Sequence, residues 1–262
     1  DGRASETLVM HEFGHQYFYG LLANNEREEA WIDEGFARYI TSRYEVEKWG
    51  PRGDRSGLNW YQRMTPQPGE WESARRDVFE LIRQGYGERV AFNSTKYDHS
   101  YRKHVYQKAS LVYNVFDFAL GDSMFDAANH MFYERWQFKH VNEDRYRAVL
   151  EEVTTRDLAR QFEQWLHTTK TVDYVLEDVR VRSDSTGVLV HAIVRRVGEL
   201  YCPIELHFTM PDGSVVKHRM DARNRSMVAR LHLPAAPVST AINPDNEIMD
   251  VDPTNNVLPS KK

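Results

Sequence analysis

The sequence predicts an α + β protein of two parts, a mostly helical part over residues 1–171 and a small antiparallel β-sandwich over residues 172–262. Apolar residues recur at helical spacing through the first part, whereas short runs of period-two alternation follow one another from Val172 onward. The length of 262 residues fits one large domain or two ordinary ones, and 41% hydrophobic residues suffice for a sizeable core.

Helices are predicted at residues 3–20, 29–49, 71–84, 102–120, 122–138, 142–153 and 156–168. Gly20 is expected to end the first helix, and Gly50 and Pro51 follow the second. The segment 51–70 is rich in Gly, Pro and Trp, so we expect it to be irregular apart from a short helix near Leu58–Met64.

Strands are predicted where apolar and polar residues alternate, in the runs "YVLEDVRVRS", "VLVHAIVRR", "IELHFTM", "SVVKHRM" and "SMVARLHL". Turn residues separate these runs at 185–187, 211–213, 222–224 and 244–246. About seven strands within the last part of the chain favour a sandwich of two sheets.

Composition narrows the classes of partner. A net charge of −5 and a pI near 6.1 give no reason to expect nucleic acid. Cys202 is the only cysteine, which excludes a disulfide framework and a thiolate metal site within the chain. The longest apolar runs are shorter than a membrane span of about 20 residues. The chain starts with Asp and has no leader pattern, so we expect it to begin inside a larger protein.

The first chemical motif is "HEFGH" at residues 11–15, which follows the H-E-x-x-H pattern. On a helix, positions four apart lie on one face about 6 Å apart, so His11 and His15 can bind one ion. Glu12 points to the flank, where it can reach a metal-bound water without being a ligand. The motif alone also fits a solvated helix face.

A second helix adds Glu34, within "WIDEGFARY" and nineteen residues after His15. Two histidines and one glutamate leave a coordination position open, which is typical of a catalytic rather than a structural zinc. We therefore predict one Zn²⁺ per chain. Asp33 and Asn24 are candidates to orient these ligands, and the acidic residues at 26, 28 and 29 read as a solvated helix start.

The segment "HEFGHQYFYGLLANNEREEAWIDEGFARY" resembles the zinc-binding segment of the M1 aminopeptidases, which are gluzincins. That family has H-E-x-x-H, eighteen residues, and then Glu within W-x-x-E-G, and the matching residues are His11, Glu12, His15, Trp31, Glu34 and Gly35. The resemblance implies a thermolysin-like catalytic subdomain that hydrolyses peptide bonds with zinc. It also implies removal of N-terminal residues from a peptide substrate, with Glu12 as the general base.

Further along, "HVYQKASLVYNVF" at 104–116 resembles the family's Y-E-K-G helix. The resemblance implies that Tyr106 hydrogen-bonds the oxyanion of the transition state, and Lys108 matches the family's Lys. Ala109 departs from the family's Gly. Tyr101 is a second candidate for the tyrosine role.

The family's upstream G-x-M-E-N strand, which binds the substrate's amino terminus, has no counterpart in this sequence. The resemblance implies that an N-terminal β domain and the first part of the catalytic domain lie outside this chain, and that the β domain packs on it. The helical tail and β-rich segment resemble bacterial members, which are often exported or membrane-associated, although the sequence itself fixes no compartment. Two alternatives remain open: a non-catalytic M1-like scaffold that binds proteins, and an epoxide hydrolase. The β-sandwich carries no chemical signature and is expected to be structural support.

Overall fold

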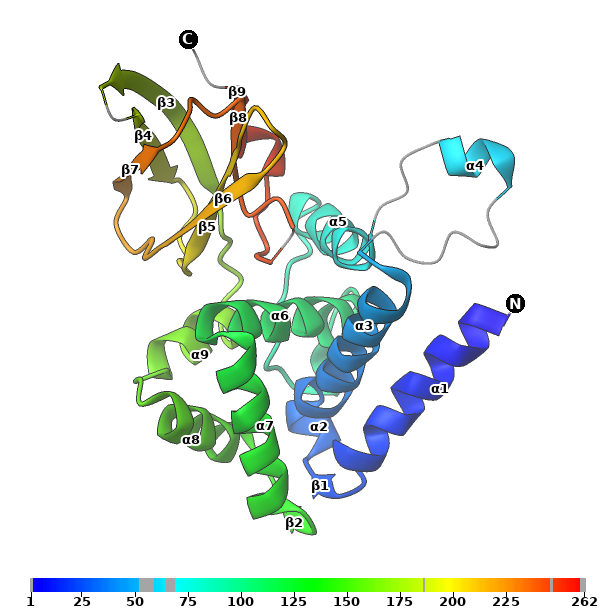
Figure 1. Ribbon diagram of the computed structural model, residues 1–262. Coiled ribbons are helices and arrows are strands. Elements are labelled where there is room, and N and C mark those ends of the chain that lie inside the picture. The colour runs from blue at the N-terminus through cyan, green and yellow to red at the C-terminus, as the bar shows by residue number, and fades with distance from the viewer. Residues whose placement is uncertain (1, 52–58, 65–68, 186, 246, 260–262) are drawn as a thin grey trace. The chain divides into compact units, whose positions relative to one another are not determined.

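The computed structural model describes residues 2–51, 59–64, 69–185, 187–245 and 247–259. The chain divides into two compact units, Asp1–Thr169 and Lys170–Lys262. The division falls at 169 rather than at the expected 171. The first unit is helical and the second consists of antiparallel strands, which confirms the predicted fold class (Figure 1).

The helical unit contains the α-helices α1 (Gly2–Tyr17), α2 (Glu26–Glu29), α3 (Phe36–Trp49), α4 (Trp60–Met64), α5 (Glu70–Arg83), α6 (Ala109–Leu120), α7 (Asp122–Trp136), α8 (Glu143–Thr154) and α9 (Ala159–Leu166). These lie close to the predicted ranges, and α4 lies within the predicted short helix, of which Leu58 is outside the described residues.

The main departure from the predicted helices is a pair of π-helical turns. One of them, η1 (Trp31–Gly35), runs directly into α3, and the other, η3 (Lys103–Lys108), runs directly into α6. A π-helical turn interrupts the regular 3.6-residue period and is often found at functional sites. These two turns carry Glu34 and Tyr106.

A buried aromatic cluster anchors η1 to the rest of the helical unit. Trp31 is 1% exposed, and its ring centroid lies 5.7 Å from that of Tyr113, 6.3 Å from Tyr146 and 6.5 Å from Phe162. Aromatic pairs at such distances add to the free energy gained by burial alone. The tryptophan of the motif therefore holds η1 in place from the core side.

Helix α1 runs alongside α3 (Figure 1). Gly14 allows this close approach, because a Cβ atom there would lie 2.9 Å from Ile40 Cδ1 and 3.2 Å from the Cα of Ala37. After α1, the short strand β1 (Leu22–Ala23) pairs in parallel with β2 (Lys139–His140), which follows α7. The sequence did not predict this pairing, since a two-residue strand has no periodic signal.

Within its described residues, the second unit has two antiparallel sheets. One has the order β3 (Tyr174–Asp184), β4 (Gly187–Arg196), β7 (Ser226–Leu233); the other has the order β6 (Val215–Met220), β5 (Ile204–Thr209), β8 (Ser239–Ile242), β9 (Val257–Pro259). Burial alternates along β4, as the period-two pattern predicts. The turn at 211–213 joins β5 to β6, and Gly213 has a φ of 85° that favours glycine.

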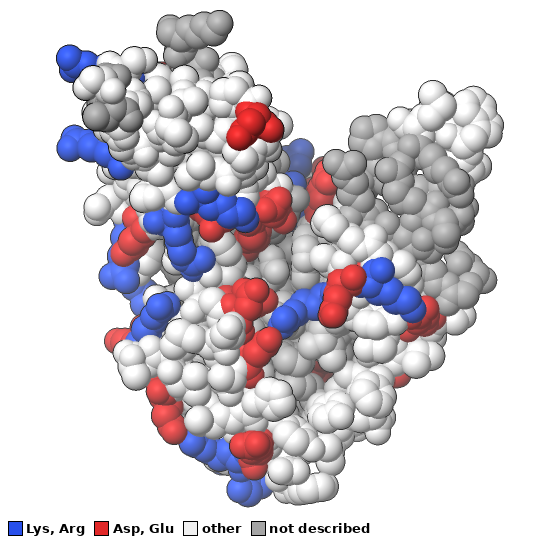
Figure 2. Space-filling model, viewed as in Figure 1, with Lys and Arg blue, Asp and Glu red and all other residues white. Residues whose placement is uncertain are grey.

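Charged side chains of both signs are interspersed on the face shown in Figure 2, in agreement with a net charge of only −5. None of the described helices is long and apolar enough to cross a membrane.

Candidate metal centre

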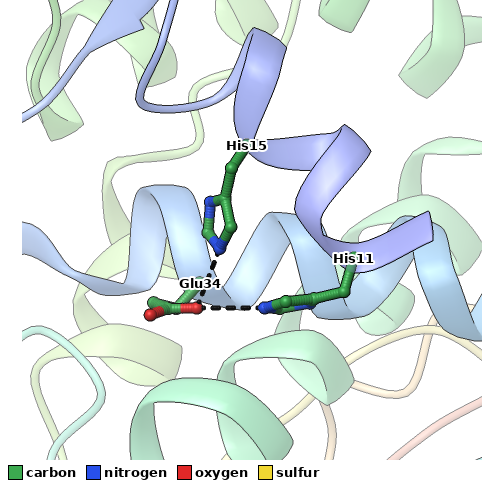
Figure 3. Close-up of side chains that lie close together, drawn as sticks. All are labelled: His11, His15 and Glu34. Carbon is green, nitrogen blue, oxygen red and sulfur yellow. Dashed lines mark hydrogen bonds and ion pairs between the residues drawn. The ribbon is translucent and has the colours of Figure 1, made fainter. Parts of the chain in front are cut away.

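Three side chains from two neighbouring elements meet at one point (Figure 3). His11 and His15 project from one face of α1, and Glu34 reaches them from η1. Glu34 Oε2 lies 3.2 Å from His11 Nε2 and 3.1 Å from His15 Nε2. The potential ligand atoms of all three residues lie within 4.8 Å of one another.

This arrangement fits a tetrahedral zinc ion. Zinc bonds of about 2.0–2.1 Å imply ligand-to-ligand distances of about 3.4 Å, close to the nitrogen-to-oxygen distances above. The side chains of His11, His15 and Glu34 are 14%, 18% and 20% exposed, so the cluster is shielded but not closed to solvent. Two imidazoles and a carboxylate form the donor set of a catalytic zinc with an open position.

The electrostatics keep Glu34 in the form that binds cations. Burial alone would raise the pKa of Glu34, but hydrogen bonds with His11, His15 and Tyr106 outweigh burial and lower it to about 2. The hydrogen bond with Glu34 also raises the pKa of His15, against the opposing effect of burial. Glu34 is therefore an ionised carboxylate across the physiological pH range.

Tyr106 completes the cluster on the side of η3. Its hydroxyl donates a hydrogen bond to Glu34 Oε1, and its ring stacks on His11 with a centroid distance of 5.7 Å and an interplanar angle of 24°. Burial, followed by the bond to Glu34, raises the pKa of Tyr106 well above its usual value. Tyr106 is therefore a protonated donor at the edge of the centre.

Tyr101 lies beside Tyr106, with ring centroids 6.0 Å apart. Burial, and to a smaller extent the nearby charge of Glu34, raises the pKa of Tyr101 to about 12. Tyr101 thus packs beside Tyr106, and it is Tyr106 whose hydroxyl is hydrogen-bonded to Glu34.

A set of buried polar contacts holds η3 in position. Lys108 Nζ donates to the carbonyl oxygen of Glu88 at 2.7 Å, and the backbone N–H of Glu88 donates to His104 Nε2 at 2.9 Å. His104 Nδ1 in turn lies 2.7 Å from the carbonyl oxygen of Ser100, which places the ring proton on Nδ1. Glu88 has no sequence signal for this role, because it acts mainly through its backbone.

Close backbone packing holds Glu34 against the same region. A Cβ atom on Gly35 would lie 2.6 Å from the Cβ of Ala109 and 3.3 Å from the carbonyl oxygen of Val105. The glycine of the motif therefore lets η1 approach η3 and α6.

Asp33 contacts the backbone beside Glu34. Its Oδ1 atom accepts a hydrogen bond from the backbone N–H of Glu34 at 2.6 Å, and burial raises the pKa of Asp33 to about 6.

The other candidate residues take different places. Glu12 is exposed on α1, next to the cluster in sequence. Asp33 and Asn24 were candidates to orient the ligand histidines. In the structure, the carbonyl oxygen of Phe18 takes this role for His15, at 3.3 Å from Nδ1. Asn24 instead donates to the carbonyl oxygen of Glu29.

Two of the acidic residues before η1 accept hydrogen bonds from parts of the chain that are distant in sequence. Glu29 Oε1 accepts from the backbone N–H of Glu143 at 2.8 Å, and Glu28 Oε1 accepts from Asn93 Nδ2 at 2.6 Å. Glu26 and Glu28 are exposed, in agreement with the solvated helix start expected from the sequence, whereas Glu29 is half-buried.

Comparisons with known proteins give a family and a similar fold. The sequence model of the peptidase family M1 domain matches residues 1–165. Among solved structures, Legionella pneumophila aminopeptidase A in complex with aspartic acid has a similar fold, with a TM-score of 0.67 and 12% sequence identity over 93% of this chain. This chain covers 26% of that chain's length. No curated protein matches in sequence.

Proposed function

Because the chain belongs to peptidase family M1, with residues 1–165 matching the family's domain, we propose that it hydrolyses peptide bonds with the aid of a zinc ion. The observation that carries this proposal is the convergence of His11, His15 and Glu34 with the hydroxyl of Tyr106 at their edge. His11, His15 and Glu34 would hold one Zn²⁺ per chain.

Held by these three residues, zinc would supply Lewis-acid activation of a water molecule and of the scissile carbonyl. The carboxylate of Glu12 accepts a proton from the attacking water and delivers it to the nitrogen of the leaving amine. The Tyr106 hydroxyl exchanges its bond to Glu34 for one to the substrate oxygen that becomes negatively charged. Glu34 stays ionised throughout, and the stacked ring of Tyr106 fixes the orientation of His11.

The chemistry of the site favours peptide hydrolysis in general, and family M1 membership favours an aminopeptidase. We propose removal of N-terminal residues on that ground, together with the fold shared with an aminopeptidase. The residues that bind the substrate's amino group are proposed to lie upstream of this sequence, since the sequence holds no G-x-M-E-N strand.

The test uses fluorogenic aminoacyl amides and the intact protein, prepared with one equivalent of zinc. Glu12→Gln is expected to lower kcat by at least 100-fold, as is typical for the loss of a general base that contributes about 10²–10⁴-fold. Zinc content is expected to stay near that of the wild type, because Glu12 is not a ligand. Glu47→Gln, on the exposed side of α3, serves as the matched control and should retain full activity.

Four outcomes count against the proposal. Near-normal turnover in Glu12→Gln with zinc bound would remove Glu12 as the base. Zinc bound without hydrolysis of any aminoacyl amide would favour the scaffold alternative, and turnover of lipid epoxides in its place would favour an epoxide hydrolase. Failure of the wild-type protein to bind zinc would remove the metal from the proposal.

A further inference from the structure

Glu26 begins the helical segment that leads to the candidate metal centre. Helix α2 starts at Glu26, and the backbone stays helical at Ala30, with φ −57° and ψ −17°, before η1 and α3 follow (Figure 1). Glu34 comes eight residues after Glu26, which is about two helical turns and about 12 Å along the axis. Glu26 and Glu34 therefore lie on the same side of this segment, with Glu34 at the centre and Glu26 two turns before it.

The carboxylate of Glu26 has no partner among the residues that the structure describes. Glu26 is exposed, and none of the described residues forms a hydrogen bond or an ion pair with its carboxylate. Arg27 follows it directly, but adjacent positions of a helix do not face each other. Glu28 on the same helix differs, because its Oε1 atom accepts a hydrogen bond from Asn93 Nδ2 at 2.6 Å. Glu26 is thus an available negative charge near the centre.

Tyr101 lies near both Glu26 and the centre. The hydrogen bond between Glu28 and Asn93 holds the segment that precedes η3 against α2. Further along this segment, the ring centroid of Tyr101 lies 6.0 Å from that of Tyr106. Burial is the main cause of the raised pKa of Tyr101, and the charge of Glu26 is one of the smaller causes, which indicates that the two side chains are close. An aromatic ring and a carboxylate therefore lie together beside the centre.

The distance from Glu26 to the centre decides which group of a substrate can reach it. The scissile carbonyl must lie at the centre, and the α-amino nitrogen of an N-terminal residue is only about 2.5 Å from that carbonyl carbon. A carboxylate two helical turns away is too far for this nitrogen. The side chain of arginine or lysine extends roughly 6–7 Å beyond its Cα, so its charged end can meet the carboxylate of Glu26.

We propose that Glu26 binds the cationic side chain of an arginine or lysine at the N-terminal position of a peptide substrate. The ring of Tyr101 packs against the same side chain, through its apolar stem and by a cation–π contact. This assignment rests on the proposed function, since it places the scissile carbonyl at the centre formed by His11, His15 and Glu34. Glu26 then determines specificity for basic substrates and takes no part in the chemical step.

The test measures kcat/KM of the zinc-loaded intact protein for arginine and citrulline amides, which have nearly the same shape but differ in charge. We expect the wild type to prefer the arginine amide at least fivefold, as for a partly exposed ion pair supported by a cation–π contact. Glu26→Gln should bring this ratio close to one, and Glu26→Lys should invert it. Glu28→Gln removes the same charge from another face of α2, so it is the matched control and should keep the wild-type ratio.

Calorimetry separates this inference from the proposed function, because binding of the two amides requires no turnover. The preference measured as a ratio of Kd values should change in the same way across the variants. Hydrolysis of both amides with the same ratio in the wild type and in Glu26→Gln overturns the role of Glu26 and leaves the proposed function standing. A Kd preference that depends on Glu26, without hydrolysis of either amide, supports the role of Glu26 and overturns the proposed function. Equal Kd values of the two amides for the wild type overturn the inference. Melting temperatures by circular dichroism check that each variant is folded.

Discussion

At the scale of single residues, Tyr106 has two features that suit a donor and not a ligand. Its hydroxyl is bonded to Glu34 Oε1, whereas the histidine nitrogens meet Oε2 of the same carboxylate. Its raised pKa keeps the proton on the hydroxyl. Under the proposed function, the loss of this hydroxyl should affect turnover and leave metal binding intact.

We predict that Tyr106→Phe lowers kcat about 10²–10³-fold, the usual effect of removing one oxyanion donor. Zinc content should stay within experimental error of the wild type, since the ring and its stacking on His11 remain. Steady-state kinetics and metal content measured on the same preparations check this. A kcat within threefold of the wild type would exclude Tyr106 as the donor, and Tyr101→Phe then becomes the variant to test.

Lys108 occupies a position of the family motif, but its contacts here are structural. It is 4% exposed and its ammonium group donates to the carbonyl oxygen of Glu88. Burial lowers the pKa of Lys108 from 10.5 to about 8. Between these two values the unfolded chain binds more protons than the folded chain, so this residue makes the free energy of unfolding rise with pH.

We predict that the free energy of unfolding of the wild type rises by about 2 kcal/mol relative to Lys108→Met between pH 8 and pH 10. Urea unfolding of both proteins at several pH values measures the difference. Lys96→Met, in a segment where the lysine is exposed, should show no such relative change. Parallel pH curves for the wild type and Lys108→Met would mean that Lys108 ionises alike in the folded and unfolded states.

At the scale of elements, the site depends on how closely η1 lies against α6. Gly35 has a helical backbone with φ −63° and ψ −43°, so alanine is conformationally allowed there. The obstacle is the Cβ of Ala109, 2.6 Å from where a new Cβ would be. The family's motif often has glycine where this chain has Ala109, so the two positions should be coupled.

We predict that Gly35→Ala lowers the free energy of unfolding by about 1–3 kcal/mol, as is typical of overpacking, and weakens zinc binding by shifting Glu34. In an Ala109→Gly background the same substitution should be neutral or stabilising, because the contact is relieved and alanine is the better helix former. A double-mutant cycle by urea unfolding measures the coupling. Additive effects of the two changes would show that η1 and α6 are not in tight contact at this point.

The sequence was informative where a periodic or spaced signal exists. Apolar spacing predicted the helices, and alternation predicted β3 to β7, whereas the short strands β8 and β9 lie outside the alternating runs. The H-E-x-x-H spacing and the position of Glu34 predicted the residues that meet in Figure 3, whose role as zinc ligands stays a prediction. Contacts made by backbone atoms carry no such signal. The sequence therefore missed the hydrogen bonds of Glu88, the carbonyl of Phe18 beside His15, the pairing of β1 with β2, and the π-helical turns.

At the scale of the whole molecule, α1 carries an exposed apolar row next to the candidate metal centre. Leu8, Val9 and Phe13 are 58%, 64% and 54% exposed. Grouped apolar side chains at a surface are typical of an interaction site. Since the chain covers 26% of the length of the Legionella aminopeptidase chain, we propose that the family's upstream β domain covers this row.

We predict that Phe13→Ser changes the free energy of unfolding of this chain by less than about 0.5 kcal/mol, because an exposed side chain gains little from folding. In a longer protein that includes the upstream β domain, the same change should cost about 1.5–3 kcal/mol, the value of burying a phenylalanine. Urea unfolding of both lengths measures the difference. Val228→Ser on the β unit, where the valine is 46% exposed, is the control and should have the same small effect in both. If Phe13→Ser is equally neutral at both lengths, the upstream domain does not pack on α1, and the apolar row must bind another partner.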